Sequence, residues 1–237
     1  MVDILAIGAH PDDIELGCGG TLFKHIQEGC SVGLLDLCRG ELGTRGTPEI
    51  REEEAKSAAL AMGAKFRWNA ELPDGFLFSN RENNSRVATF IRRARPRLVI
   101  AGAPRDRHPD HGRSAEIARE AFFLSGLRAL ELKWEGEKLE SYRPGLLIHY
   151  IQDYHLEPDL VVDISPFMEK KVEVVKLFST QFYNPDLNEP DTPISNRDYF
   201  DQLRAKARTY GRYTGCEYGE GFLVNRPLGV DDLLKVT

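Results

Sequence analysis

Short apolar runs alternate with longer segments of helical period along most of the chain, and this alternation constrains the fold more than any other feature of the sequence. The apolar runs are rich in β-branched residues, which are typical of buried strands. The segments between them place apolar residues on one helix face, as Leu16, Leu22, Phe23 and Ile26 do after the first run. Strands that alternate with helices form parallel βαβ units, so we predict an α/β fold.

The expected elements follow from this pattern and from the proline, glycine and capping residues at their ends. Strands are expected at residues 3–9, 32–38, 65–68, 97–103, 146–151 and 160–164. Helices are expected at residues 47–63, 84–95, 113–124, 166–178 and 198–213, in addition to the one that carries Leu16. The expected architecture is a three-layer, Rossmann-like open sheet, mostly parallel, with strand order 3-2-1-4-5 and helices on both faces.

Length and composition indicate a single domain over residues 1–237, because 41% hydrophobic residues are enough for one large core. The formal net charge of -6 argues against a nucleic-acid partner, which would need a basic surface. The N-terminus lacks the basic segment of a signal peptide, and no apolar run approaches a membrane span. The four cysteines show no CxxC spacing, which favours reduced thiols. We therefore expect a cytoplasmic protein without a membrane partner.

Two clusters of histidine and aspartate follow strands that we expect to be neighbours. His10-Pro11-Asp12-Asp13 follows the first strand, and His108-Pro109-Asp110-His111 follows the fourth. In a doubly wound sheet, the carboxyl ends of strands one and four meet at the switch point where ligands bind. We therefore expect the two clusters to face each other across this crevice.

The residue types in the two clusters predict a metal site. A spacing of three places His10 beside Asp13, and His108 beside His111, on one side of a first helical turn. Two imidazoles and one carboxylate can then bind one ion and leave a position for water, which is the pattern of a catalytic zinc site. Iron(II), cobalt and manganese suit the same donors. Taken singly, each cluster is more often a helix cap or an isolated histidine pair, so the expected proximity of the two favours the metal.

The segment Ala9-His10-Pro11-Asp12-Asp13-Ile14-Glu15, followed by Gly19-Gly20, resembles the AHPDDxE signature of the LmbE-like (PIG-L) deacetylase family. The second cluster is similar to the family's HPDH motif. Both motifs match without a gap, in the family's order and at about its separation. The resemblance extends to Arg51 and to Pro73-Asp74-Gly75.

This resemblance implies a zinc-dependent hydrolase that removes the acetyl group from an N-acetylglucosamine-containing small molecule. It makes His10, Asp13 and His111 the zinc ligands, and Asp12 the general base. Asp12 adjoins a ligand, so it can lie beside the water whose pKa the zinc ion lowers. The similarity is greatest to the bacillithiol-pathway branch, which implies N-acetylglucosaminyl malate as the substrate and a homo-oligomer, a hexamer, as the assembly.

Further residues complete the expected site. We expect protonated His108, oriented by Asp110, to stabilise charge or act as an acid; the alternative is a structural histidine beside the site. Arg51 resembles a family arginine that pairs with the substrate's carboxylate or hydroxyl groups, although by sequence alone it is one charge in a Glu-rich helix. Tyr199 resembles a family tyrosine that hydrogen-bonds the oxyanion, which implies that it binds the substrate. The proline-containing segment 183–195 is expected to be a surface loop and a candidate lid.

Two other functions stay open. A noncatalytic metal- or sugar-binding module would keep the same pocket, because a pocket does not prove turnover. A dinucleotide-binding oxidoreductase would share the strand, the turn and an acidic residue such as Asp36 near the end of the second strand. The glycine fingerprint of that class is missing, and Asp12 and Asp13 at a helix N-terminus would repel a pyrophosphate.

Overall fold

A seven-stranded sheet forms the centre of the computed structural model, which describes residues 1–235. The strand order is β3-β2-β1-β4-β7-β9-β8. The strands are β1 (Ile4–Gly8), β2 (Val32–Asp36), β3 (Phe66–Asn69), β4 (Leu98–Gly102), β7 (Leu146–Tyr150), β8 (Leu160–Asp163) and β9 (Gly219–Val224). The five neighbouring strands β3, β2, β1, β4 and β7 are parallel, whereas β9 pairs antiparallel with both β7 and β8.

The predicted strand order 3-2-1-4-5 is confirmed, with β7 as the fifth parallel strand. The sheet continues beyond β7 through β9, a strand that the sequence pattern did not predict. Gly219 and Gly221 interrupt the apolar alternation of this segment, so it lacks the usual signal of a strand. The predicted strand at residues 160–164 is present as β8, which lies at the antiparallel edge of the sheet.

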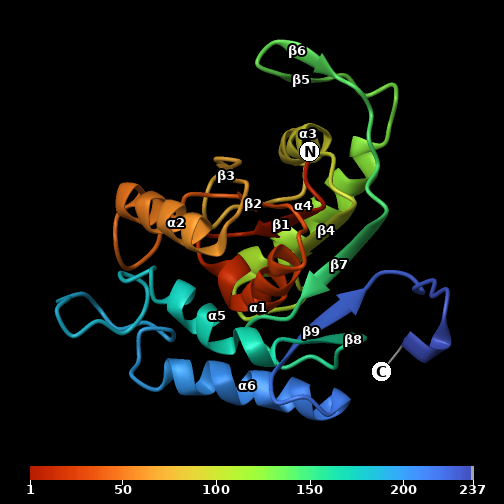
Figure 1. Ribbon diagram of the computed structural model, residues 1–237. Helices are drawn as coiled ribbons and strands as arrows, with labels where there is room; N and C mark the ends of the chain where they lie inside the picture. The colour runs from red at the N-terminus through yellow and green to blue at the C-terminus, as the bar shows by residue number, and fades with distance from the viewer. Residues whose placement is uncertain (236–237) are drawn as a thin grey trace.

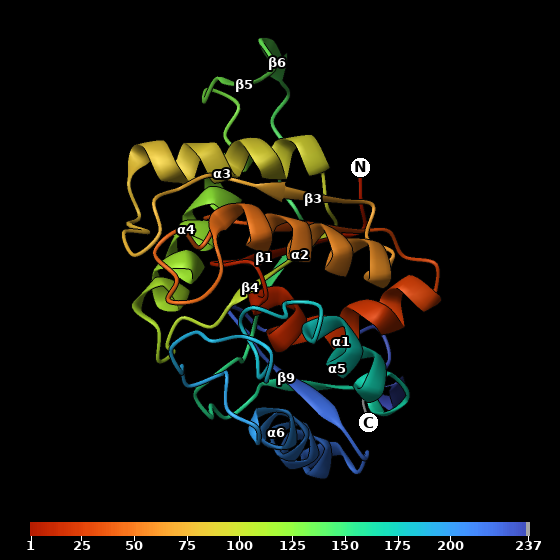
Figure 2. The ribbon, with the colours of Figure 1, turned by 90° about the vertical axis from the view of Figure 1, so that its left-hand side faces the viewer.

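Helices cover both faces of the sheet (Figures 1 and 2). One face carries α1 (Asp13–Gln27), α2 (Pro48–Met62) and α5 (Met168–Val175), and the other carries α3 (Arg81–Ala94) and α4 (Pro109–Ser125). Alternate residues of β1 pack on opposite faces of the sheet: Ile4 and Ala6 belong to one apolar cluster, and Leu5 and Ile7 to the other. Because both faces are covered, β1 is buried along its whole length, which explains its continuous apolar sequence.

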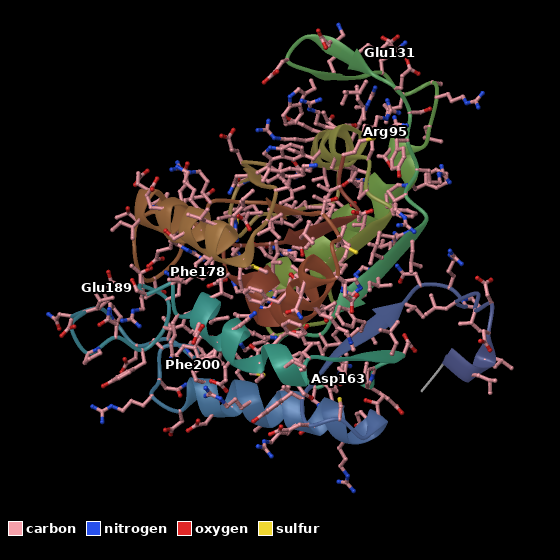
Figure 3. All side chains as sticks on the ribbon, in the orientation of Figure 1. Arg95, Glu131, Asp163, Phe178, Glu189 and Phe200 are labelled. Carbon is pink, nitrogen blue, oxygen red and sulfur yellow. The ribbon has the colours of Figure 1, made fainter. Side chains whose placement is uncertain are left out.

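The C-terminal part of the chain packs below α1 and α5 in Figure 1. The helix α6 (Tyr199–Thr214) lies against β8 and β9, and a short 3-10 turn, η1 (Ser165–Phe167), precedes α5. Phe178, just beyond α5, and Phe200, at the start of α6, join the same apolar cluster (Figure 3). A further 3-10 turn, η2 (Leu233–Lys235), ends the described chain.

The helix boundaries differ from expectation mainly at α4. This helix begins at Pro109 rather than at residue 113, because Nδ1 of His108 accepts a hydrogen bond from the backbone N–H of Asp110 at 3.2 Å and caps the helix. Proline at the first helical position has no N–H to satisfy. The second histidine cluster is therefore the first turn of α4.

A two-stranded hairpin, β5 (Leu132–Trp134) and β6 (Glu137–Leu139), extends beyond α3 on the side away from α6 (Figures 1 and 2). Its Trp134 ring lies 5.2 Å from Trp68 and 5.3 Å from Phe90, which anchors the hairpin to the sheet and to α3. None of the helices within residues 1–235 combines the length and the apolar character of a membrane span.

Candidate active site

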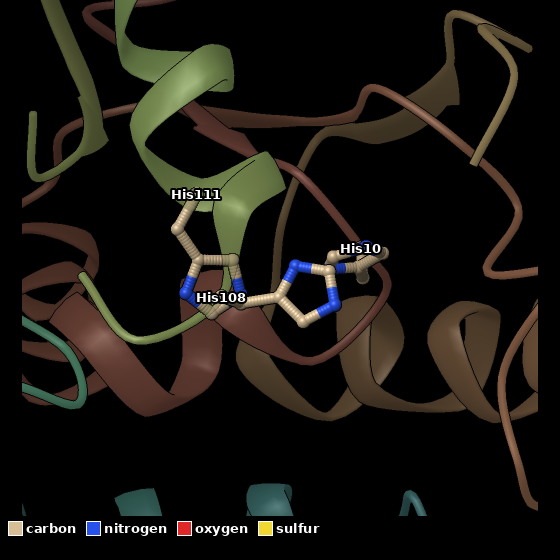
Figure 4. Close-up of side chains that lie close together, drawn as sticks. All are labelled: His10, His108 and His111. Carbon is tan, nitrogen blue, oxygen red and sulfur yellow. The ribbon is translucent and has the colours of Figure 1, made fainter. Parts of the chain in front are cut away.

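The two histidine clusters meet at the carboxyl ends of β1 and β4, which are paired in the sheet. The ring centroid of His10 lies 4.8 Å from that of His108 and 5.5 Å from that of His111. One ring nitrogen from each of the three histidines lies within 4.8 Å of the others. Figure 4 shows His10, on the turn after β1, facing His108 and His111 at the start of α4. The expected proximity of the two clusters is therefore present.

Each cluster forms a tight turn that carries its side chains to the same edge. The backbone N–H of Asp13 bonds to the carbonyl of His10 at 3.4 Å, and that of His111 bonds to the carbonyl of His108 at 3.1 Å. Within the first turn, Asp12 has a positive φ of 118°, a conformation that is strained for a residue with a side chain. Its side chain makes no capping bond to α1. It lines a cavity that opens over the two histidine clusters.

Asp13 lies between His10 and His111. Its Oδ2 atom is 3.4 Å from Nδ1 of His10, and its Oδ1 atom is 3.2 Å from Nε2 of His111. Two donors on one tetrahedral zinc ion, each about 2.1 Å from it, would be about 3.4 Å apart. Each of these two distances is therefore close to that between neighbouring ligands of a small divalent cation.

In both imidazoles, one ring nitrogen, the inner one, faces Asp13. The other, outer nitrogen is held by a second carboxylate. Nε2 of His10 is 3.1 Å from Oδ1 of Asp74, and Nδ1 of His111 is 3.1 Å from Oδ2 of Asp106. Such bonds fix the tautomer in which the inner nitrogen carries the lone pair, which is the usual arrangement around a ligand histidine. The donor chemistry thus fits a metal ion bound through Nδ1 of His10 and Nε2 of His111.

Sequence reasoning missed these outer carboxylates and one amide. Asp74 follows β3, Asp106 follows β4, and Gln152 follows β7, so all three lie just beyond the carboxyl end of a strand. The side-chain amide of Gln152 donates to Oδ1 of Asp13 at 2.7 Å. Their position after successive parallel strands was a usable signal, because those strand ends share one edge of the sheet.

The pKa values show that the cluster favours positive charge. Burial acts to raise the pKa of Asp13, but His111 and His10 outweigh it and hold the pKa well below the usual range. Burial acts to lower the pKa of His111, yet Asp13 and Asp106 raise it to about 9. A group of ionised carboxylates that stabilises imidazolium would stabilise a bound cation by the same interaction.

Asp12 differs from Asp13 in the direction in which its pKa is displaced. Burial raises the pKa of Asp12 to about 7, and the negative charge of Asp13 adds to this effect, while Arg51 acts against it. The guanidinium of Arg51 pairs with this carboxyl group, with Nη2 at 3.7 Å from Oδ2 of Asp12. A carboxyl group with a pKa near neutrality can both accept and return a proton.

Arg51 lines the cavity, but its guanidinium is already engaged. Nη2 donates to the carbonyl of Pro11 at 2.9 Å, and Nη1 donates to the carbonyl of Gly40 at 3.2 Å. Nη1 and Nη2 each carry a second N–H, so these two bonds do not use all the donors of the guanidinium. Arg51 therefore holds the turn that carries Asp12, and its expected pairing with the substrate stays a prediction.

His108 and Asp110 also differ from expectation. The carboxylate of Asp110 accepts from the backbone N–H of Gly75 at 2.7 Å and from Arg113 at 3.1 Å, so it does not orient the His108 ring. Burial lowers the pKa of His108, and the nearby His10 and His111 lower it further. A neutral His108 whose Nδ1 accepts the capping bond carries its proton on Nε2. In this arrangement His108 is a neutral hydrogen-bond donor, and its expected role as a protonated group stays a prediction.

A cavity of about 300 Å³ opens over the cluster. Its lining brings together segments from both halves of the chain: His10, Asp12, Asp13, Leu16, Leu42, Gly43, Thr44, Arg51, Asp74, Gly75, Arg107, His108, His111, Gln152, Asp153, Gln181, Thr192, Pro193, Ile194 and Tyr199. Tyr199 therefore lies at the site, where burial and the negative charge of Asp12 raise the pKa of its hydroxyl. The segment 183–195 is without helix or strand and borders the cavity through residues 192–194.

Comparisons with known proteins place these features in context. Residues 5–122 match the family model described as GlcNAc-PI de-N-acetylase (PIG-L). The diacetylchitobiose deacetylase of Thermococcus kodakarensis is 32% identical over 234 residues, which cover 92% of this chain and 81% of that protein. The structure of a conserved protein from Thermus thermophilus, TT1542, has a TM-score of 0.87 and 36% identity, covering 98% of this chain and 99% of that chain.

A relative with a different activity is also similar to this chain. The 4-oxalmesaconate hydratase of Pseudomonas putida is 23% identical over 192 residues, which cover 75% of this chain and 73% of that protein. A test of function must therefore separate amide hydrolysis from the addition of water to a double bond.

Proposed function

Because the chain belongs to the PIG-L family of LmbE-like deacetylases, we propose that it is a zinc-dependent deacetylase that acts on an N-acetylated amino sugar. The observation that carries this proposal is the position of Asp13, 3.4 Å from His10 and 3.2 Å from His111, beside the buried carboxyl group of Asp12. These are the groups that amide hydrolysis needs at one place: cation ligands and a base.

His10, Asp13 and His111 are the residues that would hold the ion, and the donor set of two nitrogens and one oxygen suits zinc. A zinc ion held there would lower the pKa of a coordinated water and polarise the acetyl carbonyl. Asp74 and Asp106 keep the two imidazoles in the required tautomers. Iron(II), cobalt and manganese are alternatives for the same three ligands.

Asp12 moves the proton in the proposed reaction. Its carboxylate takes a proton from the attacking water and passes it to the nitrogen of the leaving amine, which balances the conversion of amide and water into acetic acid and amine. A pKa of about 7 suits both steps near neutral pH. The N–H at Nε2 of His108 donates to the oxygen that gains negative charge as the carbonyl is attacked.

The cavity lining supports a sugar as the substrate. Gln152, Asp153, Gln181 and Thr192 offer hydrogen-bonding groups around the cluster, and a volume of about 300 Å³ suits a small ligand. Of the two arginines in the lining, Arg51 donates to two backbone carbonyls, and the half-exposed Arg107 pairs with Asp153 through Nε, which leaves its terminal N–H groups for a ligand. Arg107 would meet a carboxylate on the aglycone, which favours N-acetylglucosaminyl malate within the proposed substrate class.

The test is amine release by protein that has been stripped of metal and reloaded. We expect release from N-acetylglucosaminyl malate and from diacetylchitobiose after addition of zinc, and little from the metal-free protein. Iron(II), cobalt and manganese are added to parallel samples. Tight zinc binding without amine release would identify a noncatalytic module, and turnover of 4-oxalmesaconate without amine release would identify a hydratase.

A further inference from the structure

The outer side of the His10 ring faces a second group of donors. One donor atom each from His10, Cys38 and Asp74 lies within 4.8 Å of the other two, and all three residues are buried. Cys38 follows β2, and its Sγ atom is 3.1 Å from the carbonyl of Ala9, to which the thiol donates. This group lies behind the cluster described above and shares only His10 with the proposed zinc ligands.

The donor types suit a thiophilic divalent ion. A thiolate, an imidazole nitrogen and a carboxylate oxygen form a set that zinc and cadmium bind well. Oδ2 of Asp110 is 3.8 Å from Nε2 of His10 and supplies a candidate fourth donor. Neither Cys38 nor Asp110 lines the cavity, so an ion among these four groups would have a closed coordination shell without a place for substrate.

The two groups compete for His10. A neutral imidazole has one lone pair, so Nδ1 can bind the proposed catalytic ion only while Nε2 carries a proton, which it donates to Asp74. An ion bound at Nε2 needs the lone pair there, so the single N–H proton of the neutral ring moves to Nδ1. Occupation of the outer group therefore withdraws His10 from the proposed catalytic ion.

We propose that Cys38, His10 and Asp74 form a second, inhibitory metal site for a thiophilic divalent cation, such as cadmium or zinc in excess. On binding, the Sγ–H proton leaves to solvent, the single N–H proton of His10 moves from Nε2 to Nδ1, and the thiolate and the imidazole become ligands. The existence of the site stands on the donor geometry alone. Its inhibitory effect rests on the proposed deacetylase function, because inhibition requires His10 to be a ligand of the catalytic ion.

Cadmium is the probe, because a cadmium–thiolate bond absorbs in the ultraviolet whereas a cadmium–imidazole bond does not. Cys30 and Cys216 are partly exposed and are replaced by serine to remove background thiolates, while Cys18 is buried elsewhere, in α1. The zinc-loaded Cys30→Ser/Cys216→Ser protein is titrated with cadmium, and ultraviolet absorption and amine release are followed together. The comparison protein carries Cys38→Ser in addition; serine can still donate to the carbonyl of Ala9.

We expect the double variant to gain the thiolate band with a midpoint that matches the loss of amine release. The added Cys38→Ser change should abolish the band, leave zinc-supported turnover in place, and raise the cadmium concentration for half inhibition by at least about tenfold. The proposal is overturned if the double variant shows no band, or if the band and the inhibition persist without Cys38. A Cys38-dependent band in a protein that releases no amine would support the site and refute the deacetylase function.

Discussion

Oδ1 of Asp74, on the turn after β3, lies 3.1 Å from Nε2 of His10, on the turn after β1. This contact fixes the ring so that Nδ1 faces Asp13. We expect Asp74→Asn to lower zinc affinity by about 10- to 100-fold, because an amide holds the ring and raises its basicity less than a carboxylate does. Competition with a chromogenic chelator measures the affinity. Asp191→Asn, at an exposed position, is the control, and equal affinities for the two variants would contradict the role of Asp74.

Asp12 is the proposed base, so its replacement should affect turnover rather than metal binding. Asp12→Asn preserves the size of the side chain but cannot accept a proton from water. We expect kcat to fall by about 10²- to 10⁴-fold with one zinc ion per chain retained. Metal analysis and steady-state amine release on the same sample check both statements. Full turnover by a zinc-loaded Asp12→Asn protein would remove Asp12 from the mechanism.

His108 has two separable roles, as the cap of α4 and as a donor to the substrate oxygen. Asparagine can cap a helix but offers no N–H at the position of Nε2. We expect His108→Asn to keep wild-type stability and to lower kcat by about 10²-fold or more, the usual effect of losing an oxyanion donor. His108→Ala should lose the same activity and also about 1 kcal/mol of stability. Unchanged kcat in both variants would leave His108 as a cap alone.

Tyr199 lies in the cavity wall with its ring 5.3 Å from that of Phe182. Tyr199→Phe keeps this aromatic contact and removes only the hydroxyl group. If the hydroxyl binds the substrate, kcat/KM should fall about tenfold, which corresponds to one hydrogen bond of about 1.4 kcal/mol. The thermal midpoint should not change. A variant with wild-type kcat/KM would assign Tyr199 to packing against Phe182.

Glu220 links β9 to α1 in the interior. Its carboxylate accepts from the backbone N–H groups of Gly20 at 3.0 Å and Thr21 at 2.7 Å, and pairs with Lys171 at 2.5 Å. These amides are free because α1 departs from helical geometry at Cys18.

Replacing the carboxylate leaves the buried charge of Lys171 unpaired. We expect Glu220→Gln to lower the free energy of unfolding by about 3–5 kcal/mol, measured by urea denaturation. The matched control is Glu217→Gln, because Glu217 pairs with Arg208 on the surface; its effect should stay within about 0.5 kcal/mol. Similar midpoints for the two variants would show that the interior pair contributes little.

Much of the fold is determined by local sequence pattern. The apolar runs at β1, β2 and β4 have covered faces on both sides, so their burial leaves a direct signature in composition. The order of the parallel strands followed from that alternation together with the general rules of doubly wound sheets. The pattern did not predict β9, because glycines interrupt this segment and lower its local preference for a strand. Pairing with β7 and β8 stabilises the strand instead.

The sequence alone also identified the two motif turns, because His10 and His111 stand directly after strands whose carboxyl ends must meet. The partners of these histidines were decided only by tertiary structure. Asp74 and Asp106 reach the imidazoles from separate loops, and Arg51 turns inward to the carbonyls of Pro11 and Gly40. Hydrogen bonds between distant segments leave no periodic trace in a sequence, because they depend on distances that exist only once the chain has folded.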